Sequence, residues 1–158
     1  MKNSFPIVLM TALGFFAMNA CADTEEVSST AYWTIVAPAE EYKMTNGATM
    51  TGGGIAHANV INNEGEHLSQ WCRGITAADA EGNGLGGAGF CTIIDQAGDA
   101  MWVWFSNNAD GQGGTWGVIG GTGAYAGASG GGTSSAPTSM SPDGQSWINT
   151  STGTITTP

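Results

Sequence analysis

Short apolar stretches recur about every 10 to 15 residues along the chain, and clusters of Gly, Asn, Asp and Ser separate them. In several stretches apolar and polar side chains alternate, which is typical of half-buried β-strands. Beyond the apolar run near the N-terminus, no window has the spacing of a helix. The pattern therefore predicts an all-β protein, with strands at residues 31–37, 42–50, 54–61, 65–73, 89–95, 100–106, 115–120, 132–136 and 145–157.

About eight or nine evenly spaced strands in one chain are typical of a β-sandwich or a closed barrel. The turn sequences agree with this, because Pro142 presets its own φ and the following Asp143 and Gly144 tolerate turn conformations. Glycine accounts for 26 of 158 residues and charged residues for only 10%, against ~25% in an ordinary domain. This composition favours strands joined by tight turns.

The N-terminus has the pattern of an export signal. Lys2 precedes the apolar run Phe5–Met18, and the small residues Ala20 and Ala22 follow it. A basic start, an apolar core and a small-x-small cleavage site together predict a signal peptide at residues 1–22. The run is too short for a comfortable transmembrane span, which needs about 20 apolar residues. We therefore expect no span after the signal is removed.

Two fates of this signal stay open. Cleavage leaves a mature chain of roughly 136 residues beginning at Asp23, which is the length of one domain. Alternatively, Cys21 is lipidated and anchors the chain to a membrane. Both interpretations predict an exported protein, periplasmic or secreted. We expect a flexible polar segment at 23–30 and a single β-domain at 31–158.

The chain after the signal is strongly acidic. All 13 Asp and Glu residues lie there, against only two basic residues, Lys43 and Arg73, so the formal net charge is −11. Such a surface repels nucleic acids and anionic membranes, and we expect neither as a partner.

Two cysteines remain after the signal, Cys72 and Cys91. In an exported domain they most simply form one disulfide. A zinc site would need more ligands at regular spacing, and the histidines are only His57 and His67. We therefore predict a disulfide and no metal.

A glycine-rich stretch, GGTGAYAGASGGGT, spans residues 120–133. Part of it, from Gly121 to Ala126, has the spacing of a dinucleotide-binding fingerprint. That fingerprint needs a helix behind it, and the Gly- and Ser-rich residues that follow exclude one, so no cofactor is expected. The glycines suit a corner where strands bend sharply. The predicted corner residues are Gly121, Gly123, Tyr125 and Gly127.

The corner and its surroundings also carry a resemblance to a known family. FCTIIDQAGDAMWVWFS supplies a cysteine-bearing strand, an Asp-x-x-Gly-Asp turn and an aromatic strand, and a Gly-Thr-Trp strand leads into the corner. A later strand carries Trp147. This order resembles the allene oxide cyclase barrel-like superfamily, which is also dirigent-like, and in particular its exported bacterial members of unassigned activity. The resemblance covers roughly residues 54–157 and is strongest at 89–133.

The resemblance implies an eight-stranded antiparallel β-barrel with an apolar interior. Related barrels either cyclise a reactive small molecule or steer a radical coupling, mainly by holding an apolar substrate in one conformation. No catalytic residue of the family falls on a matching position here, so the resemblance carries no activity over.

Aromatic side chains are the candidates for ligand binding. In AMWVWFS, Trp102 and Trp104 share one face of the strand while Met101 and Val103 share the other, so both faces are apolar. Barrels of about eight strands are filled by side chains or hold one ligand, so these aromatics are either core or cavity lining. The candidate ligand-binding residues are Trp71, Trp102, Trp104 and Trp116.

His67 and Arg73 are weak candidates for catalysis. If 54–61 and 66–73 pair around a four-residue NNEG loop, His67 and Arg73 share a face with Trp71, and His57 points to the other face. Facing inward, His67 would transfer a proton and Arg73 would hold an anion or a carbonyl. Otherwise both lie in water at the rim. A slip of one residue would change this assignment.

Three functions remain after these considerations. The first is an exported barrel that binds an apolar small molecule, as an isomerase or cyclase acting by substrate positioning. The second is a non-enzymatic carrier with the same cavity. The third is a structural envelope or secreted module with a solid core. The volume of the interior separates the third from the other two.

Overall fold

The computed structural model describes residues 22–158, so Cys21 and all but the last residue of the predicted signal lie outside the described residues. No helix in the described part is long and apolar enough to cross a membrane. Residues 22–158 form ten strands and one short 3₁₀ turn. The elements are β1 (Asp23–Ala37), β2 (Glu40–Lys43), β3 (Thr49–Asn62), β4 (His67–Ala78), β5 (Gly84–Ile94), β6 (Ala100–Asn107), β7 (Gly114–Gly121), η1 (Gly123–Tyr125), β8 (Ser129–Ser134), β9 (Ser139–Met140) and β10 (Ser146–Thr157).

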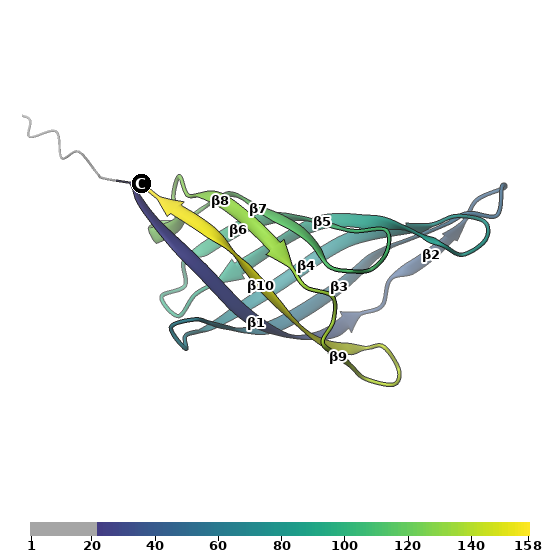
Figure 1. The fold of residues 1–158 in the computed structure, drawn as a ribbon, viewed down its shortest axis with the longest axis horizontal. Helices are drawn as coiled ribbons and strands as arrows, with labels where there is room; N and C mark the ends of the chain where they lie inside the picture. Colours follow the sequence, from purple (N-terminus) through teal and green to yellow (C-terminus); the bar gives the residue numbers. More distant parts are fainter. Residues whose placement is uncertain (1–21) are drawn as a thin grey trace, which may run out of the picture.

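Eight of the strands close into an antiparallel barrel (Figure 1). Hydrogen-bonded neighbours follow the order β1-β10-β8-β7-β6-β5-β4-β3, and pairing of β1 with β3 completes the ring. The short strand β2 pairs with one end of β3, and β9 pairs with β10. The predicted eight-stranded barrel is confirmed, and the sandwich alternative is excluded.

The first strand begins earlier than the sequence analysis predicts. Residues 23–30, expected to be flexible, form the first half of β1 and pair with β10 from Asp23 opposite Thr157 onward. The 12-residue strand β10 offers a partner long enough to satisfy the backbone of this segment. A polar segment therefore becomes a strand because its neighbour supplies the hydrogen bonds.

The β3–β4 hairpin has a three-residue loop instead of the predicted four. Asn62 pairs with Glu66, and Gly65 takes a φ of +81°. The Asn62 side chain accepts the backbone N–H groups of Glu64 and Glu66 at 3.1 and 2.8 Å. A glycine in the left-handed region is typical of three-residue hairpin loops. The predicted register is therefore wrong by one residue.

This register reverses the prediction for the two histidines. His57 lies opposite Trp71, and His67 lies opposite Ile61. Both histidines therefore share one face of the hairpin, and that face is the outer one. They are four residues apart along the strands, or about 13 Å, so they still share no metal ion.

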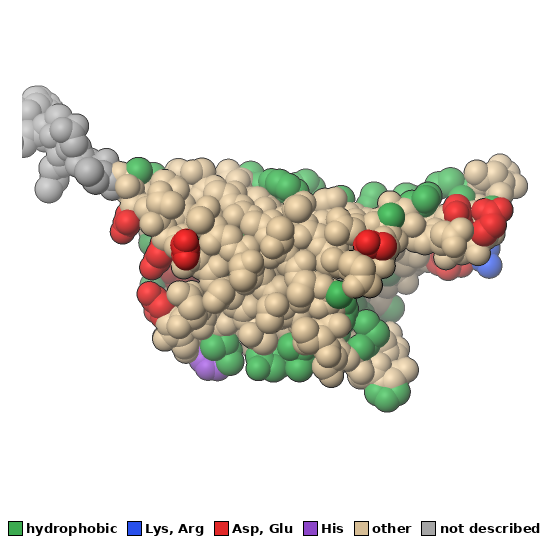
Figure 2. Space-filling model, in the orientation of Figure 1, with side chains coloured by type: hydrophobic (Ala, Val, Ile, Leu, Met, Phe, Trp, Pro, Cys, Tyr) green, Lys and Arg blue, Asp and Glu red, His purple; other side chains and the backbone are tan. Residues whose placement is uncertain are grey.

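Two small clusters of buried side chains occupy part of the interior. One contains the two cysteines with Met101 and Val103. The other contains Ala31, Ala58 and Val60. Outside the barrel, the face over β1, β8 and β10 is mostly polar (Figure 2). The buried side chains are few and small for a ring of eight strands, so they leave part of the interior unfilled.

The glycine-rich stretch forms a corner between β7 and β8, with the three-residue turn η1 at its centre. Asp99, in the turn between β5 and β6, accepts the backbone N–H of Ala124 at 2.9 Å, and Thr122 Oγ1 accepts the N–H of Ala100 at 2.9 Å. Tyr125 packs against the buried cluster around the cysteines. These two hydrogen bonds thus connect two turns that are distant in sequence.

Gly123 is the position where this corner depends most on glycine. Its φ is +50°, and a Cβ there would overlap the Asp99 carboxylate that holds Ala124. We expect Gly123→Ala to lower the free energy of unfolding by more than ~1 kcal/mol, because alanine is strained where φ is positive. Urea unfolding of both proteins measures this.

Gly144→Ala is the matched control for the Gly123 variant. Gly144 also has a positive φ, +69°, but a Cβ there meets nothing within 4 Å. It therefore reports the backbone strain alone. Equal losses of stability in the two variants would show that the Asp99 contact contributes nothing.

Candidate functional site

The barrel encloses a cavity of about 490 Å³. It extends from the start of β1, beside the C-terminus, to the far part of β3 and β4. Seven of the eight barrel strands contribute apolar side chains to its wall. These include Ala31, Trp33, Val60, Leu68, Ile93, Met101, Val103, Phe105, Trp116, Trp147 and Ile155.

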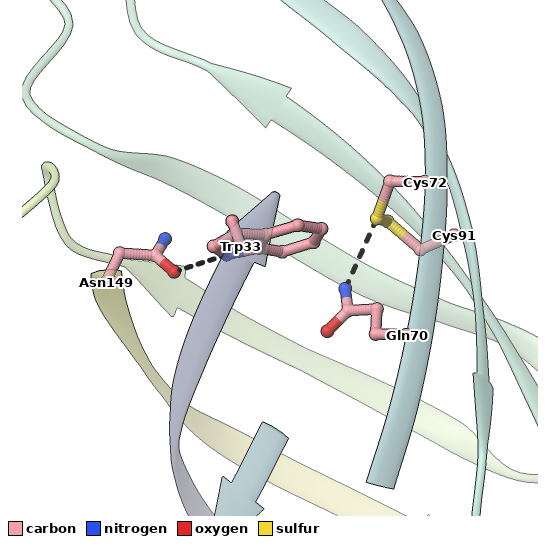
Figure 3. Close-up of a disulfide and its surroundings, with 5 residues drawn as sticks. All are labelled: Trp33, Gln70, Cys72, Cys91 and Asn149. Atoms are coloured by element: carbon pink, nitrogen blue, oxygen red, sulfur yellow. Dashed lines mark hydrogen bonds between the residues drawn. A yellow bond between two sulfur atoms is a disulfide. The ribbon is translucent and has the colours of Figure 1, made fainter. Parts of the chain in front are cut away.

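Two amide side chains lie among these apolar groups (Figure 3). The Trp33 indole N–H of β1 donates to Asn149 Oδ1 of β10 at 2.8 Å. Gln70 Nε2 of β4 lies 3.4 Å from Cys72 Sγ. Trp33 also stacks on Trp147, with ring centroids 5.6 Å apart and planes 11° from parallel. The cavity therefore offers an oriented aromatic pair and a few hydrogen-bonding groups in an apolar wall.

The predicted disulfide between Cys72 and Cys91 is confirmed. The two cysteines are directly opposite on β4 and β5, both are buried, and both line the cavity. Gln70 points toward them in Figure 3. The bridge is therefore part of the inner wall as well as a covalent tie between neighbouring strands.

Tyr125 brings a phenol to the cavity wall from the corner. Burial raises the pKa of Tyr125, and the nearby carboxylates of Asp95, Glu66 and Asp99 raise it further. The phenol therefore keeps its proton at neutral pH and remains an O–H donor.

One end of the cavity is acidic. Asp23 and Glu25 line it from the start of β1, and Glu64 and Glu66 line it from the β3–β4 loop. Figure 2 shows carboxylates gathered at this end of the molecule. Among the described residues that line the cavity there is no Lys, Arg or His. The lining therefore carries negative charge at one end and no charge elsewhere.

The four candidate tryptophans lie on two sides of the barrel wall. Trp116 lines the cavity and donates its indole N–H to the carbonyl of Thr133 at 3.3 Å. Trp71, Trp102 and Trp104 lie outside and are 44%, 42% and 40% exposed. Only Trp116 of the four is thus placed to contact a molecule inside the barrel.

The outer tryptophans belong to a broader aromatic surface. Trp71 and Trp102 border a shallow groove together with Phe90 and Arg73. Trp104 covers Gly117 of β7, where any side chain would collide with its ring. The groove is open and separate from the cavity, because the strands of the barrel lie between them.

The two weak catalytic candidates also lie outside. His67 and Arg73 share the outer face of β4 with Trp71, so neither reaches the interior. His57 Nε2 lies 3.0 Å from Ser69 Oγ on the same surface. In the described part of the chain, no three His, Cys, Asp or Glu side chains gather where they would hold a metal ion.

The sequence analysis missed the polar groups of the cavity. Trp147 and Asn149 are two residues apart on β10, and the alternation of the segment 145–157 places them on one face. That alternation was the available signal. Gln70 was missed because the predicted register of the β3–β4 hairpin was wrong. Glu25 was missed because β1 begins earlier than predicted.

Comparisons with known proteins identify the fold. No protein-family model matches the sequence, and no curated protein matches it significantly. The solved structure of the pterocarpan synthase dirigent protein GePTS1 superposes with a TM-score of 0.56 and 14% identity, over 87% of this chain and 86% of that one. The pterocarpan synthase dirigent protein PsPTS1 gives 0.53 and 12%, over 84% and 94%. The chain therefore has the dirigent-like barrel fold, as the resemblance implied.

Proposed function

We propose that the protein binds an apolar small molecule inside its barrel. The cavity of about 490 Å³ carries this proposal, because ligand sites typically occupy ~300–1,000 Å³ and combine an apolar wall with a few polar groups. Asn149, Gln70 and Tyr125 are such groups here. The third function, a module with a solid core, is disfavoured because the interior contains this space.

The two comparison structures support a role in which a substrate is held in position. Both are pterocarpan synthase dirigent proteins, and this chain shares their barrel. At 12–14% identity the likeness supports the shape of the site and not its chemistry. The reaction therefore has to be argued from the side chains of this cavity.

Catalysis by positioning is the second candidate function, and Tyr125 favours it. Its phenol lies in the wall, and burial and the nearby carboxylates keep it protonated by raising its pKa, so it can donate a hydrogen bond to negative charge that develops on a molecule held in the cavity. A carrier would use the same cavity without stabilising a transition state. The two differ only in whether the bound molecule changes.

Binding is tested with N-phenyl-1-naphthylamine, a neutral apolar dye that fluoresces on leaving water. We expect saturable binding of one dye per chain. Trp102→Ala, on the outer surface, is the control for adsorption to the exposed aromatics and should leave the affinity unchanged. Dye binding that disappears in Trp102→Ala would place the dye on the outside and contradict the proposal.

Whether the protein is a catalyst or a carrier is tested with its natural ligand. Native mass spectrometry of protein isolated from its own source shows whether a compound copurifies. That compound is then incubated with the protein and with Tyr125→Phe, and products are analysed. For a catalyst, loss of the hydrogen-bond donor should slow conversion about 10²–10³-fold. Absence of any product with both proteins identifies a carrier.

A further inference from the structure

We infer that the cavity selects a positively charged apolar molecule and excludes anions. This inference rests on the proposed function and adds the charge of the ligand to it. Four carboxylates line one end of the cavity, at Asp23, Glu25, Glu64 and Glu66, and no cationic side chain is found in the lining that the structure describes. The site is the cavity itself, and the carboxylates set its potential.

The negative potential extends into the cavity wall. Glu66, Asp95 and Asp99 all raise the pKa of Tyr125, whose half-buried side chain lines the cavity. Clefts lined by one sign of charge with low-dielectric walls focus the field and concentrate ligands of the opposite sign. A bound anion would meet this field without a single compensating cation.

The aromatic wall favours the same sign of charge. Trp33 and Trp147 form a stacked pair on the wall, with Trp116 as a third indole in the lining. The faces of indoles attract cations through the ring quadrupole, by about 0.5–2 kcal/mol for each favourable contact. An apolar cation thus gains from the middle of the cavity and from its acidic end.

Cleavage of the N-terminus would leave the acidic end of the cavity negatively charged. Cleavage in front of Asp23 would create an α-amino group at the acidic end, with one positive charge. The four carboxylates would still outnumber it. The polarity of the cavity is therefore the same for a cleaved chain and for a longer one.

Dyes of similar size and different charge test the inference. The neutral dye is N-phenyl-1-naphthylamine, the anionic one is its sulfonated counterpart anilinonaphthalene sulfonate, and the cationic one is a styrylpyridinium dye. Only the binding that Val103→Trp removes is counted, because Val103 lines the cavity and this change fills it. At low salt we expect the cationic dye to bind about tenfold or more tightly than the anionic one. Added salt should narrow the difference.

Two triple variants with the same change of net charge locate the effect. Glu25→Gln/Glu64→Gln/Glu66→Gln neutralises the acidic end of the cavity. Glu40→Gln/Glu41→Gln/Glu81→Gln neutralises three carboxylates on β2 and in the β4–β5 loop, none of which lines the cavity. We expect the cation-to-anion ratio of affinities to fall severalfold in the first variant and to stay within about twofold of the original in the second.

The outcomes separate this inference from the proposed function. Equal affinities of the cationic and anionic dyes, or equal effects of the two triple variants, would overturn the charge selection while binding of the neutral dye still supported the cavity. If Val103→Trp removes the signal of none of the dyes, the proposed function fails and the inference fails with it.

Discussion

Val103→Trp is expected to weaken binding of N-phenyl-1-naphthylamine by about 100-fold. Val103 is buried on β6, points into the barrel and lines the cavity. An indole at this position occupies space that the dye needs. Displacing one aromatic ring removes roughly 100 Å² of apolar contact, or ~2.5 kcal/mol, which is close to a hundredfold in affinity. Fluorescence titration of the two proteins measures the difference.

A second filling variant and an outer variant complete this test. Val60→Phe fills the cavity from β3 and should weaken binding of the dye similarly. With two filling variants, the test does not depend on the folding of one of them. Thr152→Phe adds an aromatic ring to the exposed face of β10 and should change nothing. Circular dichroism confirms that each variant keeps its strands. Unchanged affinity in both folded filling variants would show that the dye does not bind in the cavity.

Removal of the disulfide is expected to cost about 3 kcal/mol of stability. Cys72 and Cys91 are 19 residues apart, and closing a loop of about this length restricts the unfolded chain by ~3 kcal/mol in the chain-entropy account. For a domain of this size the loss lowers the melting temperature by about 10 °C. Thermal unfolding of Cys72→Ala/Cys91→Ala against the original protein measures it.

Reduction of the unchanged protein separates the covalent bond from the lost sulfur packing. The reduced protein retains both side chains, so its melting temperature should also fall by about 10 °C. The same reducing agent should not alter the double alanine variant. A reduced protein that melts within ~2 °C of the oxidised one would mean that the native bridge restrains little.

The strand pattern was predictable because alternation and turn residues are local properties of the sequence. Most strands were placed by these signals alone. The choice between barrel and sandwich was not local, since it depends on β1 pairing with both β3 and β10. The family resemblance decided that choice before the structure did.

The faces of the strands were harder to predict than the strands. In β6 both faces are apolar, so nothing in AMWVWFS says that Trp102 and Trp104 point outward and Val103 inward. In the β3–β4 hairpin a loop one residue too long reversed the relation of His57 to His67. A strand has a side-chain period of two, so one residue of error moves every side chain to the other face.

A recurring turn marks where several hairpins reverse direction. At Asn62, Asp79, Asp95 and Ser141 the side chain accepts the backbone N–H of the residue four or five places later. In each case a glycine three places later has a positive φ. The loops after Asn62, Asp79 and Asp95 have three residues, but the one after Ser141 has four, so the pattern marks the position of a turn without fixing its length.

The ring of strands closes where the N-terminal strand meets the C-terminal strand, so folding is complete only when these two strands pair. The N-terminal strand β1 lies between β3 and β10, so one of its two neighbours is made from residues 146–157. Until these residues take their place, β1 and β8 present unpaired backbone at an open edge. Contacts between distant parts of a chain form slowly, and such an edge invites pairing with other chains. Closure of the ring thus requires both ends of the chain at once.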